Sequence, residues 1–228
     1  MRFNRLVSAC GVVACGLAVA LAQAPKPADP PPPKPANAVP GTFRAYIALD
    51  QRTAPPKDPK EPADPKAPKE PKLTEGKRNV TGFQHDLIVA NELNPTVAVF
   101  SRSAKPDDAT AKLVGKLKEL AATYKTIDFG AYLFFPVLDK VYADDAKSKA
   151  TADELKKWGE GVPVGPVVIG LSEKDSAQTK AWNVHDTGVT VVFYNRLRVV
   201  KRWDLPPGGV TDEVIAELAA EVNKELKK

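Results

Sequence analysis

From residue 79 to the C-terminus, short apolar runs alternate with segments in which apolar residues recur every three or four positions. The short runs predict β-strands at residues 96–101, 129–137, 166–171, 189–194 and 197–203. The periodic segments predict helices that begin at Asp107 or Asp108, at a Thr151–Glu154 capping box, near Asp175 and after Thr211. Strand–helix alternation followed by a hairpin, with its turn at Asn195–Arg196, and a last helix predicts an α/β sandwich with a mixed sheet.

Residues 42–50 carry a further strand pattern, well separated from the others. Alternate side chains would lie on opposite faces, with one face made of Phe43, Ala45, Ile47 and Leu49 and the other of Arg44, Tyr46 and Ala48. A strand on its own is unstable in water. We therefore expect it to pair with the body that starts at residue 79, which makes the intervening residues an insertion within the fold.

Proline is concentrated in one part of the chain, since 15 of the 22 prolines fall between Pro25 and Pro71. One group recurs at every third position, namely Pro56, Pro59, Pro62, Pro65, Pro68 and Pro71. A polyproline II helix has three residues per turn, so these prolines would share one edge, beside a mostly basic and a mostly acidic edge. The pattern predicts a stiff spacer. Alternatively, the segment could be a ligand for a proline-recognition module, or a stalk.

The first 24 residues have the pattern of a secretory signal. Arg2 and Arg5 precede an apolar run over residues 6–21, and Ala22-Gln23-Ala24 provides a small-x-small cleavage site. The run is shorter than the roughly 20 residues that a spanning helix needs. We therefore expect export to the periplasm or the exterior, with cleavage after Ala24 and no transmembrane span in the mature chain.

The only cysteines, Cys10 and Cys15, lie inside this signal. The segment at residues 12–16, VVACG, also resembles a bacterial lipobox, in which Cys15 would be lipidated and would anchor the chain to a membrane. In both interpretations the folded body has no thiol, which excludes disulfide bonds and thiol chemistry there.

The net charge of the chain excludes few functions, apart from a strong preference for nucleic acid. The formal net charge of +5 falls to +3 when Arg2 and Arg5 are removed with the signal, which is too low to predict a nucleic-acid partner. Arg196, Arg198 and Arg202 form a basic stripe on one strand. Such a stripe either meets an anionic surface or protects an exposed sheet edge from self-pairing.

Two residue groups suggest site chemistry. The pairs His85-Asp86 and His185-Asp186 could together ligate a divalent metal if the fold joined them, although they lack the close spacing of zinc motifs. Ser101, Ser103 and Lys105 suggest a serine–lysine hydrolase, but helix-entry serines more often form caps. The chain is thus expected to hold no metal and to need no cofactor.

These patterns divide the chain into five parts. They are a signal peptide (1–24), a proline-rich tether (25–40), a strand that pairs with the body (41–52), a polyproline II insertion rich in Lys, Asp and Glu (53–78) and the folded domain (79–228).

The folded domain resembles the thioredoxin-like superfamily over about residues 81–228, and within it the redoxin-type proteins of bacterial envelopes. The residues that carry the likeness are the apolar strand ending in Phe100 and the segment WNVHDTGVTVVFYNRLRVVKRW (182–203), followed by a C-terminal helix. The resemblance implies a thioredoxin-like sandwich with a central mixed sheet flanked by helices, whose last two strands form a hairpin.

The chain departs from the family pattern at its two reactive positions. The redox motif should follow Phe100, where Lys105 and Asp108 stand in the places of the two cysteines. Gly188, in Thr187-Gly188-Val189, stands near the place of the family's cis-proline. Neither lysine nor aspartate can attack sulfur as a thiolate does, so the resemblance implies a redox-inactive domain.

The sequence therefore predicts an exported, non-catalytic binding or accessory protein of the cell envelope, with a protein or peptide partner and no cofactor. The inherited contact region would comprise Arg102, Ser103, Lys105, Asp108, Thr187, Gly188 and Val189. One alternative is a non-redox enzyme or metal-binding protein that uses the His-Asp pairs. The other is a structural envelope protein in which the rigid spacer matters most.

Overall fold

The computed structural model describes residues 37–52, 79–91, 93–142, 145–186 and 188–227. The predicted signal peptide with Cys10 and Cys15, the tether as far as residue 36 and the polyproline II insertion lie outside the described residues. Every helix within the described ranges falls short of the length and apolar character that membrane crossing requires.

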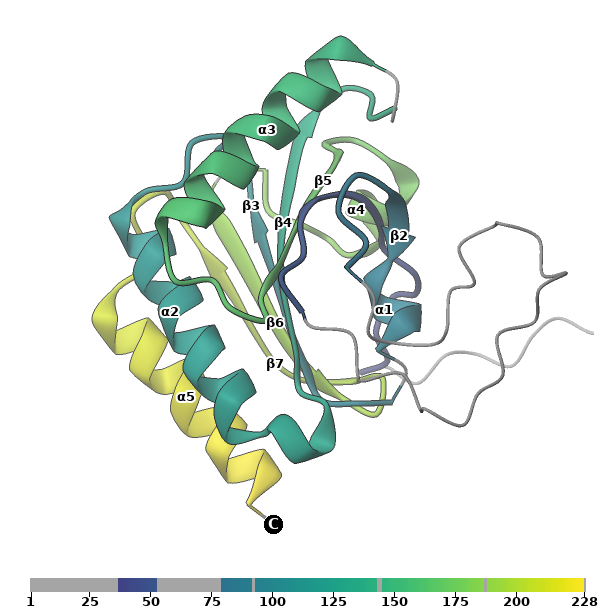
Figure 1. The fold of residues 1–228 in the computed structure, drawn as a ribbon. Coiled ribbons are helices and arrows are strands. Elements are labelled where there is room, and N and C mark those ends of the chain that lie inside the picture. Colours follow the sequence, from purple (N-terminus) through teal and green to yellow (C-terminus); the bar gives the residue numbers. More distant parts are fainter. Residues whose placement is uncertain (1–36, 53–78, 92, 143–144, 187, 228) are drawn as a thin grey trace, which may run out of the picture. The chain divides into compact units, whose positions relative to one another are not determined.

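The described residues form a seven-stranded sheet with the order β2-β1-β5-β4-β3-β6-β7 (Figure 1). The strands are β1 (Arg44–Leu49), β2 (Gln84–Asp86), β3 (Thr96–Ser101), β4 (Gly130–Leu138), β5 (Val168–Glu173), β6 (Val189–Asn195) and β7 (Arg198–Leu205). The central strands β3, β4 and β5 are parallel, and the outer pairings are antiparallel. The sheet is therefore mixed, as predicted.

The two faces of the sheet are covered differently. The long helices α2 (Asp108–Thr123), α3 (Ala146–Gly161) and α5 (Asp212–Leu226) cover one face (Figure 1). The short helices α1 (Leu87–Ala90) and α4 (Ala177–Ala181) lie on the other, and a 3-10 turn (Lys125–Ile127) follows α2. Each face has its own buried apolar cluster.

Local capping signals set most helix starts. The Asp107 carboxylate accepts hydrogen bonds from the amide and hydroxyl of Thr110 at 2.8 and 2.7 Å, and Thr211 caps α5 through the amide of Val214. The helix start predicted at Thr151 is wrong. Asp145 caps α3 earlier, because its carboxylate accepts from the amide and hydroxyl of Ser148, and Thr151 lies inside the helix.

Strand β1 lies inside the sheet, between β2 and β5, and its predicted faces need one correction. Ala45 and Ile47 contribute to the cluster under α1 and α4, but Leu49 joins Tyr46 and Ala48 on the opposite face. The pairing register between β1 and β5 shifts between Ile47 and Leu49. An irregularity of this kind moves the following side chain to the other face of the sheet.

The fully buried Asp50 joins the two described segments on either side of residues 53–78. Its carboxylate accepts from the Arg52 amide, from Arg52 Nε at 2.9 Å and Nη2 at 2.8 Å, and from the Val80 amide at 3.2 Å. The Asp50 amide donates to Thr81 Oγ1 at 2.9 Å. A buried carboxylate is stable only when it is paired in this way, so the fold joins residues 50–52 to residues 79–81.

The β6–β7 hairpin turns one residue later than predicted. Its two central residues are Arg196 and Leu197, with φ of 50° and 58°, whereas Asn195 ends β6. Two successive left-handed residues make a type I′ turn, whose twist suits the strands of a hairpin. Residues 37–39 pair beside this turn, since the Val39 amide donates to the Leu197 carbonyl at 3.0 Å.

Candidate functional site

The predicted contact region lies at the carboxyl ends of the parallel strands, where β3 ends at Ser101, β4 at Leu138 and β5 at Glu173. In open α/β sheets, ligands bind outside this end. Arg102, Ser103 and Lys105 occupy the connection from β3 to α2. The structure thus places the first half of the predicted region at the position where the fold supports a site.

Arg102 is held by the backbone of three neighbouring segments, and its side chain is only 13% exposed. Its Nη1 donates to the carbonyls of Lys174 at 2.7 Å and Pro136 at 3.1 Å. Its Nε donates to the His185 carbonyl at 3.0 Å, and its Nη2 approaches the Val184 carbonyl at 3.4 Å. The guanidinium therefore clamps the ends of β4 and β5 to the loop that precedes β6.

A second arginine holds the first half of the same loop. Arg202, on β7, donates from Nη1 to the Trp182 carbonyl at 2.8 Å and from Nη2 to the Asn183 carbonyl. Its Nε also binds the Asp204 carboxylate at 2.8 Å. Arg202 is thus not a free member of the predicted basic stripe, because its side chain fixes residues 182 and 183 while Arg102 fixes residues 184 and 185.

An aromatic cluster supports this end of the sheet. Phe43, Phe100 and Phe134 lie with ring centroids 4.7 to 5.3 Å apart, and the Trp182 ring lies 5.4 Å from Phe100. All four side chains are fully buried. The cluster therefore holds the end of α4, and with it the start of the clamped loop, on the sheet.

The second half of the predicted region is largely committed to contacts within the chain. The Arg102 amide donates to the Gly188 carbonyl at 3.0 Å, and Val189 begins β6, which pairs with β3 on one side and β7 on the other. Gly188 has φ of 82°, and a Cβ at this position would lie 2.1 Å from the Leu205 carbonyl oxygen. Only glycine fits there. Thr187 lies outside the described residues, and none of the described peptide bonds is cis.

The serines and carboxylates beside Arg102 have local structural roles. Ser101 is buried and accepts from the Ser103 amide, while the Ser103 hydroxyl donates to the Lys105 carbonyl at 2.8 Å. Hydrogen bonding from Thr110 lowers the pKa of Asp107, as expected for a helix cap, and Asp108 is the first residue of α2. This arrangement is that of a turn and a helix start, and it supplies no activated nucleophile.

The accessible part of the region is polar and carries both signs of charge. Ser103, Lys105 and Asp108 are exposed, and the Asp186 side chain extends into solvent 4.0 Å from Arg102 Nη2. Two further ion pairs lie beside them, Lys174 with Asp139 at 2.7 Å and Lys140 with Glu173 at 3.8 Å. The hydrogen bond from Lys174 lowers the pKa of Asp139 and correspondingly raises that of Lys174.

The first His-Asp pair lies on β2, at the edge of the sheet. Asp86 caps α1, since its carboxylate accepts from the amides of Ile88 and Val89 at 3.1 Å and of Phe43 at 3.3 Å. His85 is half-buried beside it. Burial lowers the pKa of His85, and the positive charge of Arg52 lowers it further.

The second pair, His185-Asp186, lies in the loop that Arg102 clamps, on the other side of the central strands. The described residues contain no group of three or more His, Cys, Asp or Glu side chains that could hold a metal ion. The structure therefore does not assemble the two pairs into the metal site that the sequence left open.

Comparison with known proteins supports the fold. No family model matches the chain, and no curated protein matches it. Among solved structures, AhpC of Mycobacterium tuberculosis has a TM-score of 0.50 at 9% sequence identity, over 82% of this chain and 91% of that one. A putative protein disulfide isomerase of Bacteroides thetaiotaomicron has a TM-score of 0.43 at 17% identity, over 64% and 81%.

At such low identity the likeness to AhpC concerns the fold alone. Together with the mixed sheet, the terminal hairpin and the flanking helices, it confirms the predicted thioredoxin-like α/β fold. The arginine clamp was not predicted, because its carbonyl acceptors lie 34 to 83 residues from Arg102 and leave no local sequence signal.

Replacing Arg102 by lysine should loosen the carboxyl end of the sheet. A single ammonium cannot reach carbonyls on three segments, so we expect the free energy of unfolding to fall by about 2–4 kcal/mol. Amide hydrogen exchange at residues 184–186 should also accelerate. The matched control is Arg198→Lys, at an exposed arginine at the start of β7. Equal stability and equal exchange in the two variants would contradict the clamp.

Stability should depend on the protonation of His85. Because its pKa is lower in the folded state than the unfolded value of about 6.5, the unfolded chain binds the proton more tightly. The free energy of unfolding should therefore be highest above pH 6.5 and fall as the pH drops towards the folded pKa. Denaturant unfolding at several pH values between 7 and 5 gives the free energy of unfolding as a function of pH. This free energy should depend less steeply on pH in His85→Gln than in the wild-type chain. If His85→Gln kept the wild-type pH dependence of the free energy of unfolding and only His185→Gln lost it, the assignment of this dependence to His85 would be refuted.

Proposed function

We propose that this chain is an exported thioredoxin-like protein of the cell envelope that binds a protein or peptide partner without thiol chemistry. The signal pattern of residues 1–24 supports export. The absence of cysteine after Cys15 removes the group that thiol–disulfide exchange requires. The observation that carries the proposal is the Arg102 clamp, which fills the end of the sheet where the family resemblance places its reactive residues.

A clamped loop surface favours binding for an energetic reason. Ordering a flexible surface on association costs free energy for each side chain and loop that must be fixed. Here Arg102 and Arg202 already fix residues 182–185, so a partner would meet a preformed surface. We assign the contact to the exposed Ser103, Lys105 and Asp108, with Asp186 beside them.

The charges of this surface indicate the chemistry of the partner. Cationic and anionic side chains alternate there, and the Gly188 carbonyl is already paired within the chain. A polar segment with charges of both signs would therefore bind through side chains and through the backbone of residues 103–106. Binding of the partner as an added strand beside residues 187–189 is less suitable, because Val189 is already paired with β3 on one side and β7 on the other.

Two segments at the borders of the described residues lie at the end of the sheet opposite the assigned surface. Residues 37–39 pair beside the β6–β7 turn, and Asp50 follows the residue that pairs with Ile169 at the start of β5. Both points lie at the amino ends of the parallel strands, opposite Arg102. The assigned contact surface therefore lies at the opposite end of the sheet from residues 37–39 and Asp50.

The redox part of the proposal predicts that the protein lacks thiol-dependent activity. Purified full-length chain should neither reduce insulin disulfides in the presence of dithiothreitol nor consume hydrogen peroxide above the buffer rate. A variant with Cys10 and Cys15 replaced by serine should behave identically. Catalytic turnover that survives in this cysteine-free variant would overturn the proposal.

The binding part predicts a localised contact. A photo-crosslinking amino acid placed at Lys105 should give a discrete adduct with an envelope protein or peptide in cells. The control places the photo-crosslinking amino acid at Lys149, an exposed residue of α3 on the helical face of the sheet, and should give no such adduct. Adducts of equal yield from both positions, or none from Ser103, Lys105 and Asp108, would count against this surface.

A further inference from the structure

Three neighbouring turns lie at the amino ends of the parallel strands. They are the loop at residues 93–95 before β3, the 3-10 turn Lys125–Ile127 before β4 and the β6–β7 turn at Arg196–Leu197. The Leu93 carbonyl accepts from the Arg196 amide at 3.1 Å, and the Pro95 carbonyl accepts from the Gly130 amide at 2.9 Å. The loop before β3 therefore joins the other two turns, and we refer to the three turns together as the amino-end surface.

Each of these turns exposes one large aliphatic side chain. Leu93 is 59% exposed, Ile127 40% and Leu197 36%. Single exposed apolar residues are ordinary on a protein surface, whereas a group of them on adjoining turns is typical of an interaction surface. The amino-end surface differs in this respect from the contact surface assigned at the carboxyl ends, whose exposed residues are polar.

The backbone at Leu197 supports a role for its side chain outside the fold. Arg196 and Leu197 have φ of 50° and 58°, and a turn of this type favours Asn and Gly because a Cβ is disfavoured in the left-handed region. Leucine therefore destabilises the turn relative to glycine. Leu197 packs against neither of the buried apolar clusters, so the core does not explain it. A contact outside the fold would explain it.

The charges of the amino-end surface favour an anionic partner. Four exposed cations lie on the three turns or beside them, namely Lys125, Arg196, Arg198 and Lys227. Two carboxylates lie among them, Asp128 and Glu225, and Glu225 accepts from Asn195 Nδ2 at 3.3 Å. Glu92 and Lys228, which have opposite charges, lie outside the described residues. Four cations against two carboxylates leave this end of the described fold positive.

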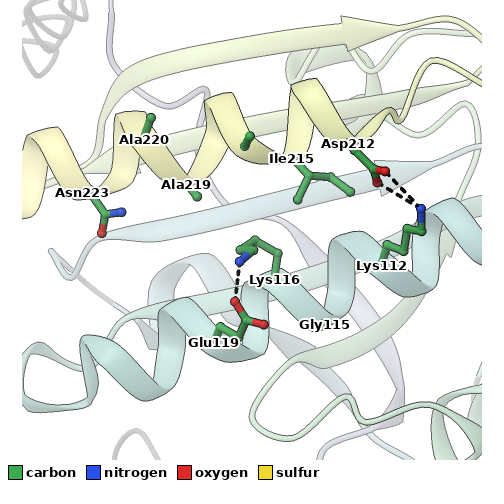
Figure 2. Close-up of a pocket in the computed structure, with 10 residues that line it drawn as sticks. Lys112, Gly115, Lys116, Glu119, Asp212, Ile215, Ala219, Ala220 and Asn223 are labelled. Carbon is green, nitrogen blue, oxygen red and sulfur yellow. Dashed lines mark hydrogen bonds and ion pairs between the residues drawn. The ribbon is translucent and has the colours of Figure 1, made fainter.

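Lysines on the neighbouring faces add nothing to this excess, because carboxylates of the same chain already pair with them. Lys112 of α2 pairs with Asp212 of α5 at 3.0 Å, as Figure 2 shows. The same holds for three further pairs, namely Lys116 with Glu119, Lys201 with Glu217 and Lys224 with Glu221. Neither Arg196 nor Arg198 forms an ion pair with another described residue.

An anionic bilayer combines the two features that this surface can bind. Its phosphates attract the arginines, and the boundary between headgroups and acyl chains accommodates exposed aliphatic side chains. A nucleic acid would use the cations alone. The described chain also begins at this end, since the Val199 amide donates to the Asn37 carbonyl at 2.7 Å. The predicted signal, or a lipidated Cys15 in the lipobox interpretation, is therefore connected to the fold from this side.

We propose that the amino-end surface binds an anionic lipid bilayer. Leu93, Ile127 and Leu197 enter the headgroup boundary, while Arg196 and Arg198 bind lipid phosphates. Three aliphatic side chains and a small excess of positive charge supply the attraction, so binding is reversible and sensitive to salt. This contact is separate from the contact surface at the carboxyl ends, and neither depends on the other.

A fluorescent label at one position tests the proposal in the full-length chain. Cys10 and Cys15 are replaced by serine, and a polarity-sensitive label is attached at Leu93→Cys. Phosphatidylglycerol vesicles should shift its emission to shorter wavelength, and high salt should reduce the shift because it screens the charges. The matched control, a label at Lys105→Cys, lies at the opposite end of the sheet and should show no shift. Because each label reports its own surroundings, insertion of the apolar run at residues 6–21 does not mimic this result.

Three outcomes of this experiment would overturn the proposal. The first is the absence of a shift at Leu93→Cys with phosphatidylglycerol vesicles. The second is an equal shift with neutral phosphatidylcholine vesicles, which would leave the cations without a role. The third is an equal shift with heparin in place of lipid, which would identify a soluble polyanion as the occupant.

Charge variants in the labelled chain test the role of the two arginines. Combining Arg196→Gln with Arg198→Gln should raise the lipid concentration for a half-maximal shift by roughly 25-fold, since each cation near an anionic membrane contributes about fivefold. Combining Arg196→Lys with Arg198→Lys keeps both charges and should bind nearly as the parent does. Equal loss of binding in the two double variants would contradict an electrostatic contact with the bilayer.

A turn variant separates binding from folding. Leu197→Gly removes the Cβ from a left-handed position, so the melting temperature should stay equal or rise by a few degrees. The lipid concentration for a half-maximal shift should nevertheless rise roughly fivefold, because an aliphatic side chain no longer enters the bilayer. Unchanged lipid binding in this variant would overturn the proposal. A lower melting temperature would assign the leucine to the fold and would count against it as well.

Discussion

The guanidinium of Arg102 is the interaction on which the geometry of the carboxyl end depends. It lies one residue after β3 and donates to a carbonyl near the end of β4, to one just after β5 and to two that precede β6. Buried carbonyls without donors are costly, and loops at a strand end have few regular partners. One permanently charged side chain with donors in a fixed planar fork satisfies several of them together. The position of each loop is therefore coupled to that of the others.

This clamp changes what the end of the sheet can do. A guanidinium is neither a nucleophile nor a proton acceptor at physiological pH, and once its donors are taken it has little left to offer a ligand. Its contribution is rigidity, reinforced by the Phe43, Phe100, Phe134 and Trp182 cluster beneath it and by Arg202 on the same loop. The local interactions at this end of the sheet thus fix the loops in place.

The sequence predicted those features whose signals are local. Asp107 and Thr211 were recognisable as caps because each lies three residues before the amide that it binds, and the strand at residues 96–101 is a continuous apolar run. The start of α3 was missed because Asp145 and Thr151 both resemble caps and the earlier one prevails. Leu49 was assigned to the wrong face because a register shift depends on the partner strand. The Arg102 clamp could not be predicted either, because it also depends on distant parts of the chain. Its acceptors are backbone carbonyls, which any residue could supply.

The two ends of the sheet thus differ in the contacts that hold them. At the amino ends of the parallel strands, Asp50 and the pairing of residues 37–39 with β7 fix the points from which the chain leaves the described fold. At the carboxyl ends, two arginines fix loops that carry exposed charges. The strands between these ends are buried, so both sets of contacts are held on one closely packed sheet. The carboxyl end is therefore the end at which buried donors fix the loops while charged side chains remain exposed, and the proposed contact surface rests on this arrangement.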